Sequence, residues 1–313
     1  MIPVKGATRF LKASLFQLQR LLDQGDGVIF QLHSVADKNF LDTRLVSNPA
    51  MELAVNDLET GLKELQDQDV MFISMDQLHE MLGKPEASKD QRFALLTLDD
   101  GYRDNYSNVF PLCKRLDIPF TLYLITGFPD GTQLHYAALL QDWVQENEAL
   151  EFTHKGKVHH FQTRSRQEKQ ESYQAICTLL ASSFIGADYP KFFEENGIEP
   201  RRYTLNWEEV EEMAGSELVT LGSHTMSHRP LTTLNEVELE RELCGSKQRI
   251  EEMSGAVVHH LSYPFGKYGT REICAARKAG YLTATTTKQG FVKLGKARDM
   301  ALSRVLFSPG RKA

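Results

Sequence analysis

The sequence predicts an α/β fold, because apolar runs typical of buried strands end in polar motifs that can form a site. One run covers residues 93–96 and leads into two aspartates, and another covers residues 217–221 and leads into two histidines. A third, short run around Leu261 leads into an aromatic turn. Because α/β folds place catalytic groups at strand ends, we expect the three motifs to lie together.

The first motif, Thr97-Leu98-Asp99-Asp100-Gly101, sets two carboxylates side by side where a strand ends. Successive strand side chains point to opposite faces, so one site can use both only if the backbone turns, and Gly101 permits that turn. One carboxylate can then bind a metal while the other handles a proton. By itself, Asp-Asp-Gly also fits a simple turn.

The second motif, residues 222–228, contains two histidines four positions apart. At roughly 5–6 Å between Cβ atoms, as on one helical turn, His224 and His228 can converge on one ion. With one aspartate they supply three ligands, and a zinc site of that kind keeps a position for water, whose pKa falls to about 7. A polar loop with incidental histidines is the alternative.

The third motif, Leu-Ser-Tyr-Pro-Phe-Gly at residues 261–266, completes a recognisable order. The three motifs resemble those of the polysaccharide deacetylase family, also called the NodB-homology domain or carbohydrate esterase family 4. The resemblance extends from about Val28 to Phe307. It implies an irregular (β/α) barrel of the polysaccharide deacetylase type, with the site at the C-terminal ends of the strands.

The resemblance also implies a role for each motif residue. Asp99 corresponds to the general base, whereas Asp100, His224 and His228 correspond to the ligands of a divalent metal, with Zn²⁺ preferred and Co, Ni, Mn or Fe as alternatives. The backbone N–H of Phe265 corresponds to a donor that stabilises the oxyanion of the transition state.

The chain departs from the family pattern at Ser262, where many members carry an arginine that pairs with the base aspartate. Arg304, in Leu-Ser-Arg-Val, resembles the arginine of a Leu-Pro-Arg-Ile segment near the C-terminus of related sequences. We expect Arg304 to replace the missing arginine, because such a partner keeps a carboxylate ionised. The alternative is a surface arginine that ends an edge strand.

A second departure concerns the general acid, since no histidine follows His260. Residues 27–33 read as a strand that ends in His33, which resembles the Tyr-His-x-Val segment of a circularly permuted subgroup. Closing a barrel brings the first and last strands side by side, so His33 is our candidate acid. The alternative is a histidine in a polar loop after a buried strand.

The third departure is length, because about 95 residues separate Gly127 from Gly222. We predict one barrel domain over residues 1–313, with an insertion at about 128–205 beside the site. The insertion reads as a helix at 135–146, a hairpin at 151–162 and a helix at 165–184. Another helix begins near Asn206, with Glu209 in a capping box.

Composition favours an enzyme that does not bind nucleic acid, since the net charge is −6 and the isoelectric point about 6.0. The four cysteines lack paired spacing, and the N-terminal segment lacks the continuous apolar core of a signal peptide. We therefore expect a cytoplasmic protein.

Residues 1–24 interleave basic and apolar side chains at spacings compatible with an amphipathic helix. Such a helix can lie on the cytoplasmic face of the inner membrane, or it can pack across a barrel end.

The expected reaction removes an N-acetyl group from an amino sugar. A cytoplasmic enzyme would meet a glycan or glycolipid precursor, such as a lipopolysaccharide core, a capsule or a lipid-linked intermediate. Three alternatives remain: a glycan-binding barrel without activity, a hydrolase of a non-sugar amide, and a non-haem iron oxygenase. The oxygenase would need neither Asp99 nor the Tyr-Pro-Phe-Gly segment.

Overall fold

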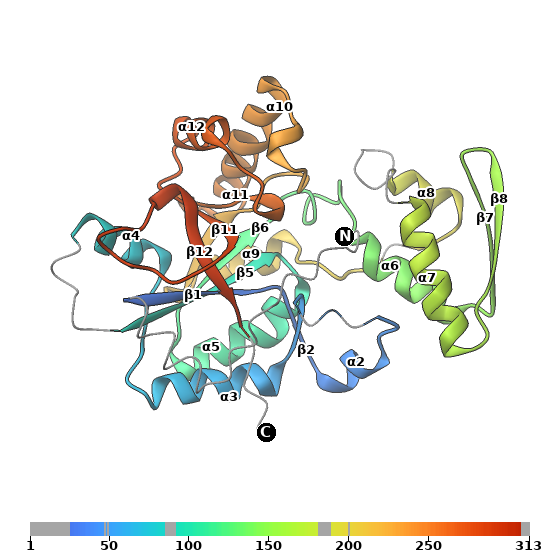
Figure 1. The fold of residues 1–313 in the computed structure, drawn as a ribbon, viewed down its shortest axis with the longest axis horizontal. Helices are drawn as coiled ribbons and strands as arrows, with labels where there is room; N and C mark the ends of the chain where they lie inside the picture. The colour runs from blue at the N-terminus through green and yellow to red at the C-terminus, as the bar shows by residue number, and fades with distance from the viewer. Residues whose placement is uncertain are drawn as a thin grey trace.

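A closed barrel of parallel strands forms the centre of the protein (Figure 1). The computed structural model describes residues 26–46, 48, 50–84, 92–180, 189–199 and 201–307. Around the ring the strands are β1 (Gly27–Leu32), β12 (Leu302–Leu306), β11 (Thr283–Gln289), β10 (His260–Ser262), β9 (Val219–Ser223), β6 (Phe120–Leu124) and β5 (Phe93–Asp100). Pairing of β1 with β5 closes the ring, which confirms the predicted (β/α) barrel.

The first and last barrel strands lie side by side, as closure requires. Phe30 pairs with Val305, and Gln31 pairs with Leu306. All eight residues of β5 are buried, which explains why this strand reads as an almost continuous apolar run. Residues from both ends of the chain therefore reach the same edge of the barrel.

Helices and turns surround the barrel. The helices are α2 (Lys38–Thr43), α3 (Val55–Gln66), α4 (Met75–Gly83), α5 (Phe110–Leu116), α9 (Trp207–Ala214), α10 (Glu236–Glu240), α11 (Ser246–Ser254) and α12 (Thr270–Lys278). The π-helical turns are η2 (Asn105–Val109) and η4 (Arg241–Gly245), and the 3-10 turns are η3 (Leu231–Thr233), η5 (Pro264–Gly266) and η6 (Asp299–Ala301). Short strands β2 (Ser34–Ala36) and β3 (Glu52–Ala54) pair with each other, and β4 (Met71–Phe72) pairs with the start of β5.

Alternate residues of the strands belong to different cores. Phe30 and Leu96 belong to the large cluster that lies between the strands and the surrounding helices, among them α3 and α5 (Figure 1). Ile29 and Leu95 belong to a second cluster, with Met75 of α4. Because strand side chains alternate, residues two positions beyond Ile29 and Leu95 continue on this second face.

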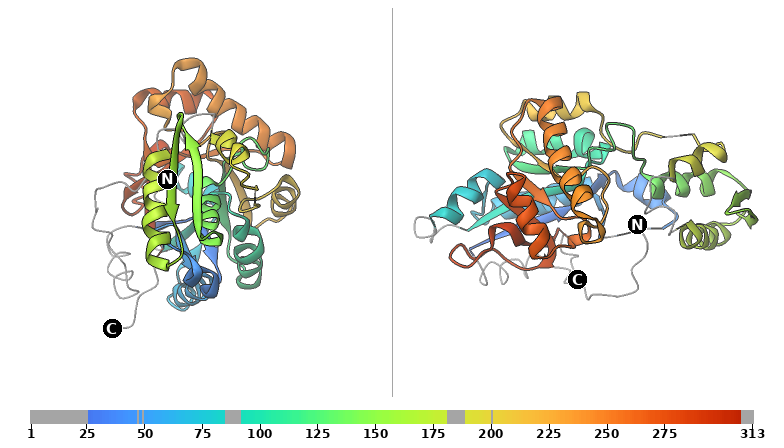
Figure 2. Two further views of the ribbon diagram at one scale, coloured as in Figure 1. Left: turned by 90° about the vertical axis from the view of Figure 1, so that its right-hand side faces the viewer. Right: turned by 90° about the horizontal axis from the view of Figure 1, so that it is seen from above.

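The predicted insertion lies beside the barrel (Figures 1 and 2). It contains α6 (Tyr136–Glu146), the hairpin of β7 (Ala149–His154) and β8 (Lys157–Gln162), α7 (Arg166–Leu180) and α8 (Tyr189–Glu195). Its apolar side chains form a separate core, which Leu45 from the segment after α2 also joins and in which Trp143 packs on Phe152 and Phe192. The predicted helix, hairpin and Asn206–Glu209 capping box are confirmed, whereas the expected end of the second helix, residues 181–184, lies outside the described residues.

The predicted amphipathic helix at residues 1–24 also lies outside the described residues. In the part of the chain that is described, no helix has the length and apolar character needed to span a membrane. The four cysteines, Cys113, Cys177, Cys244 and Cys274, are all free thiols.

Candidate active site

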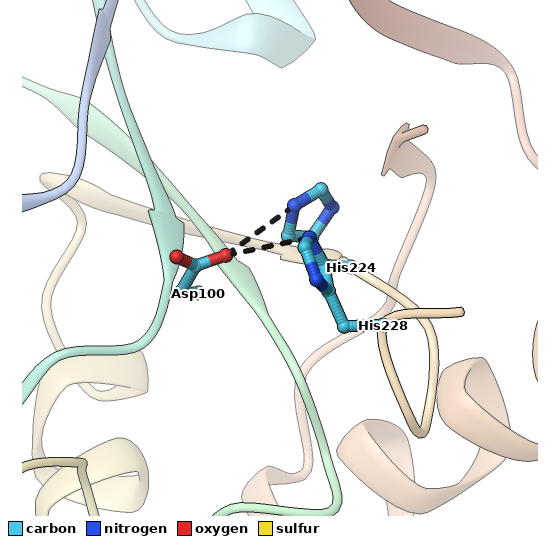
Figure 3. Close-up of side chains that lie close together, drawn as sticks. All are labelled: Asp100, His224 and His228. Carbon is cyan, nitrogen blue, oxygen red and sulfur yellow. Dashed lines mark ion pairs between the residues drawn. The ribbon is translucent and has the colours of Figure 1, made fainter. Parts of the chain in front are cut away.

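Three potential metal ligands converge at the C-terminal ends of β5 and β9. Asp100 ends β5, and His224 and His228 lie on the loop after β9 (Figure 3). Their ligand atoms all lie within 4.8 Å of one another. The Nε2 atoms of His224 and His228 lie 3.5 Å and 3.7 Å from Oδ1 of Asp100.

The backbone turns at Asp100 itself, one position earlier than the glycine suggested. Asp100 has φ +77°, and Gly101 has φ +90°. Asp99 is two residues beyond Thr97 and four beyond Leu95, so it follows the second face of β5, and regular alternation would send Asp100 to the other side. The left-handed conformation of Asp100 keeps both carboxylates at one site, as the sequence predicted. Aspartate is one of the few residues that tolerate this conformation.

The hydrogen bonding and burial of His224 and His228 suit both side chains to bind a metal ion. His224 Nδ1 lies 2.7 Å from the carbonyl oxygen of Ser262, so that nitrogen donates and leaves the Nε2 lone pair toward Asp100. Burial lowers the pKa of both His224 and His228, which keeps the imidazoles neutral. Two neutral imidazoles and a carboxylate are the donor set of a catalytic zinc site, so these residues fit a divalent cation.

Asp100 has an unfavourable environment for a free carboxylate. Burial, followed by the charge of Asp99, raises its pKa to about 8. A cation bound by Asp100 would reverse this effect, because its charge would be the largest in the site.

Asp99 is held by Arg304. Two parallel hydrogen bonds of 2.7 Å join Nη1 and Nη2 of Arg304 to Oδ1 and Oδ2 of Asp99. Arg304 is 1% exposed, and its strand β12 has a partner on each side, which excludes the alternative of a surface arginine on an edge strand. Burial opposes ionisation of Asp99, but the charge and hydrogen bonds of Arg304 lower its pKa well below the usual range.

Arg304 also contacts the position where the family arginine is missing. Its Nη2 donates to Ser262 Oγ at 3.1 Å, Nη1 donates to Thr97 Oγ1 at 3.0 Å, and Nε donates to the carbonyl oxygen of Thr286 at 3.0 Å. All five guanidinium contacts are thus made inside the barrel end. Arg304 of the last strand therefore reaches Asp99 past Ser262, whose small side chain leaves space for the guanidinium.

His33 lies close to Asp99 at the end of β1. Its Nε2 is 3.9 Å from Oδ2 of Asp99, and Asn105 Nδ2 donates to the His33 carbonyl oxygen at 2.8 Å. Burial lowers the pKa of His33 to about 4, although the charge of Asp99 opposes this effect. His33 is therefore a buried, neutral imidazole beside the proposed base rather than a histidine in a polar loop.

Gln31 is a site residue that our reading of the sequence missed. Its Nε2 donates to Oδ2 of Asp99 at 3.0 Å. The signal was present, because Gln31 is the only polar residue of the apolar strand β1 and lies two positions before His33, on the same face.

Phe265 is at the rim of the site. It has φ +57°, its side chain is 42% exposed, and its ring centroid lies 4.6 Å from that of His228. The expected oxyanion role of its N–H stays a prediction.

Comparison with known proteins agrees with this geometry. The model of the family described as "Polysaccharide deacetylase" matches residues 86–284, which include Asp99, Asp100 and all of the second and third motifs. The chain belongs to the polysaccharide deacetylase family. The match does not test the expected circular permutation, which stays a prediction.

Individual relatives of this polysaccharide deacetylase are distant in sequence. YxkH of Bacillus subtilis (strain 168), provisionally named a polysaccharide deacetylase, is 22% identical over 285 residues, which are 90% of this chain and 71% of YxkH.

Solved structures share the fold. The Streptococcus pyogenes deacetylase PplD, solved in complex with acetate, superposes with a TM-score of 0.60 at 15% identity, over 91% of this chain and 93% of PplD. IcaB from Ammonifex degensii gives a TM-score of 0.58 at 18% identity, over 91% of this chain and 94% of IcaB. A de-N-acetylase from Aggregatibacter actinomycetemcomitans also gives 0.58, at 16% identity, over 90% of this chain and 95% of that protein.

Proposed function

We propose that the protein is a metal-dependent deacetylase that removes the N-acetyl group from an amino sugar of a glycan or glycolipid precursor. One observation carries the proposal: an Arg304-held Asp99 lies directly beside the convergent cluster of Asp100, His224 and His228. The family membership supports the deacetylase chemistry, and the geometry supports its division between two adjacent carboxylates.

Asp100, His224 and His228 would hold the divalent ion, for which Zn²⁺ is our first choice. When bound, such an ion supplies a Lewis acid and lowers the pKa of water to about 7.

Asp99 acts as the proton acceptor in this proposal. Arg304 keeps it ionised and fixes its orientation through two hydrogen bonds, and Gln31 holds the same carboxylate from the other side. As water adds to the carbonyl carbon of the acetamide, its proton passes to Asp99.

His33 completes the proton transfer. It is neutral before the reaction, because burial lowers its pKa to about 4, and its Nε2 lies 3.9 Å from Oδ2 of Asp99. His33 would take up the proton that Asp99 accepts once a side-chain movement of about 1 Å brings the two atoms to hydrogen-bond distance. It then donates the proton to the amide nitrogen as the C–N bond breaks, which gives acetate and a free amine.

Two departures prompted the alternative of an inactive glycan-binding barrel: the family arginine absent at Ser262 and the missing C-terminal histidine. Arg304 makes the bidentate contact with Asp99 instead, so the departure at Ser262 gives no support to loss of activity, and His33 is our candidate for the missing histidine.

The compartment and the substrate class belong to the same proposal. Four free thiols suit a reducing cytoplasm, where N-acetylated sugars occur in precursors of lipopolysaccharide, capsule or lipid-linked glycans. The insertion beside the barrel would select among these acceptors, and residues 1–24 would bring the enzyme to the membrane face.

Acetate release from a panel of N-acetylated nucleotide sugars, glycolipids and chitin oligomers tests the proposal. The parent chain should release acetate from at least one precursor when supplied with Zn²⁺, whereas Asp99→Asn should release none. Asp67→Asn, on the exposed end of α3, is the matched control and should keep full activity. Metal binding by the parent chain without acetate release from any substrate would instead favour a glycan-binding role.

A further inference from the structure

The loop that carries both histidines has an unusual backbone. Thr225 has φ +70° and His228 has φ +55°, a left-handed conformation that is especially unfavourable for a β-branched residue. Thr225 stabilises the loop locally, since its N–H donates to Ser223 Oγ and its Oγ1 accepts from the His228 N–H. The N–H groups of Met226 and Ser227, between the two histidines, need other partners.

Glu242 supplies these partners from outside the barrel. It lies in the π-helical turn η4, between α10 and α11, and is 8% exposed. Its Oε2 accepts from the N–H of Met226 at 2.8 Å and of Ser227 at 3.0 Å, and its Oε1 accepts from Ser227 Oγ at 2.5 Å. One carboxylate therefore binds the whole middle of the loop.

In the described part of the chain, the side-chain hydrogen bonds of Glu242 all go to this loop. Among the described residues, no basic side chain forms an ion pair with Glu242, whereas its neighbour Glu240 lies 3.4 Å from Lys278 Nζ at the surface. A buried carboxylate is costly unless hydrogen bonds compensate it, and charge-assisted bonds to N–H groups are among the stronger ones. The π-helical turn that presents Glu242 is a feature often found at functional sites.

We propose that Glu242 is a positioning residue that holds His224 and His228 in register with Asp100 and so sets the affinity for the divalent metal. The inference rests on the proposed function, because it takes this cluster to be the metal site. Partners one step beyond the ligands typically change metal affinity by about 10–100-fold when removed.

Zinc affinity of the full chain, measured by competition with a chromophoric chelator, tests the role. Glu242→Ala should weaken binding by about 10–100-fold. Glu242→Gln should keep most of the affinity, because its amide oxygen can accept both N–H groups and its NH₂ can donate to Ser227 Oγ. Glu240→Ala, an exposed glutamate two residues away, should bind zinc as the parent does.

Unchanged zinc affinity in folded Glu242→Ala would overturn the proposal. If circular dichroism shows that this variant does not fold, Glu242→Asp replaces it: the carboxylate remains but is one methylene shorter, so affinity should again fall, and parent-like affinity would be the contrary result. A purely structural role would lower the melting temperature of the zinc-free protein and leave the affinity of folded molecules unchanged. Zinc binding without acetate release in the parent would defeat the proposed function alone, since affinity is measured independently of turnover.

Discussion

The two adjacent aspartates of the site, Asp99 and Asp100, have opposite electrostatic environments. Asp99 accepts two hydrogen bonds from Arg304 and one from Gln31, and its pKa lies well below the usual range despite its burial. Asp100 faces two neutral imidazoles at 3.5 Å and 3.7 Å, and burial together with the Asp99 charge raises its pKa to about 8. One carboxylate is stabilised as an anion by the protein itself, and the other is suited to a cation from outside.

The difference arises from one backbone step. Asp99 continues the face of β5 that carries Thr97, where Arg304 of β12 meets it, whereas Asp100 turns through a left-handed conformation toward the histidine loop. The two aspartates therefore have different proposed roles because different strands lie beside them. Residues of β1 and β12 contact Asp99, the proposed proton acceptor, whereas the loop after β9 brings the two histidines to Asp100, the proposed metal ligand.

Loss of His33 should have the largest effect on turnover, because His33 is the proposed general acid. His33→Ala should lower turnover by about 10²–10⁴-fold, the usual contribution of general acid–base catalysis, and leave bound zinc unchanged. Acetate release and metal analysis of the same preparation measure both. His259→Ala, which lies just before β10 at the barrel end opposite the site, is the control and should keep parent turnover. Retained activity in His33→Ala would remove this residue from the mechanism.

Arg304→Met should destabilise the protein by about 3–5 kcal/mol, because it leaves Asp99 buried and unpaired. The lowered pKa of Asp99 stabilises the parent at pH values above the unfolded pKa of about 3.9, and this contribution is lost as pH falls. The deficit of the variant in urea unfolding should therefore be smaller at pH 3 than at pH 6. Arg277→Met breaks an exposed pair with Asp299 and should cost at most about 1 kcal/mol. Equal costs at the two positions would contradict the account.

Zinc affinity should rise with pH because Asp100, a proposed ligand, must lose its proton to bind the ion. A proton must leave Asp100 before it can ligate, so affinity should increase by about tenfold per pH unit up to its pKa of about 8. His224 and His228 are neutral over this range, since burial lowers their pKa values. Stability of the zinc-free protein should show the opposite trend and fall as pH rises from about 4 to 8, because the folded state holds the Asp100 proton more tightly than the unfolded state. Chelator competition at pH 6 and pH 8 would show a flat response if Asp100 is not a ligand.

Loss of the Gln31 side chain should have the smallest effect among these four predictions. Gln31→Leu removes one hydrogen bond to a charged group, worth about 1.5–3 kcal/mol, and leaves the Arg304 contact in place. Unfolding in urea measures the loss, and zinc affinity should not change. A change in zinc affinity would mean that contacts of Asp99 also affect the metal ligands, contrary to the separate roles proposed for Asp99 and Asp100.

The sequence predicted those parts of the site whose residues belong to recognisable motifs. The barrel, the convergence of Asp100 with the two histidines, and the contact of Arg304 with Asp99 were all expected, because strand ends meet at one edge and closure joins the first and last strands. The roles of these residues stay predictions.

Other parts of the site depend on contacts that local sequence does not encode. Gln31 meets Asp99 only through the register of β1 on β5, which pairs residues 66 positions apart such as Gln31 and Thr97. Glu242 looks like any polar residue of a helix, and its burial results from how η4 packs on the histidine loop. The left-handed conformation of Asp100 was expected only at the following glycine.

Zinc content and acetate release, measured together for Asp99→Asn and Asp100→Asn, test most directly whether the two aspartates divide the chemistry. Asp99→Asn should bind zinc as the parent does and release no acetate, whereas Asp100→Asn should lose both zinc and activity. Loss of zinc from Asp99→Asn, or parent-like zinc binding by Asp100→Asn, would contradict the division of tasks between these neighbours.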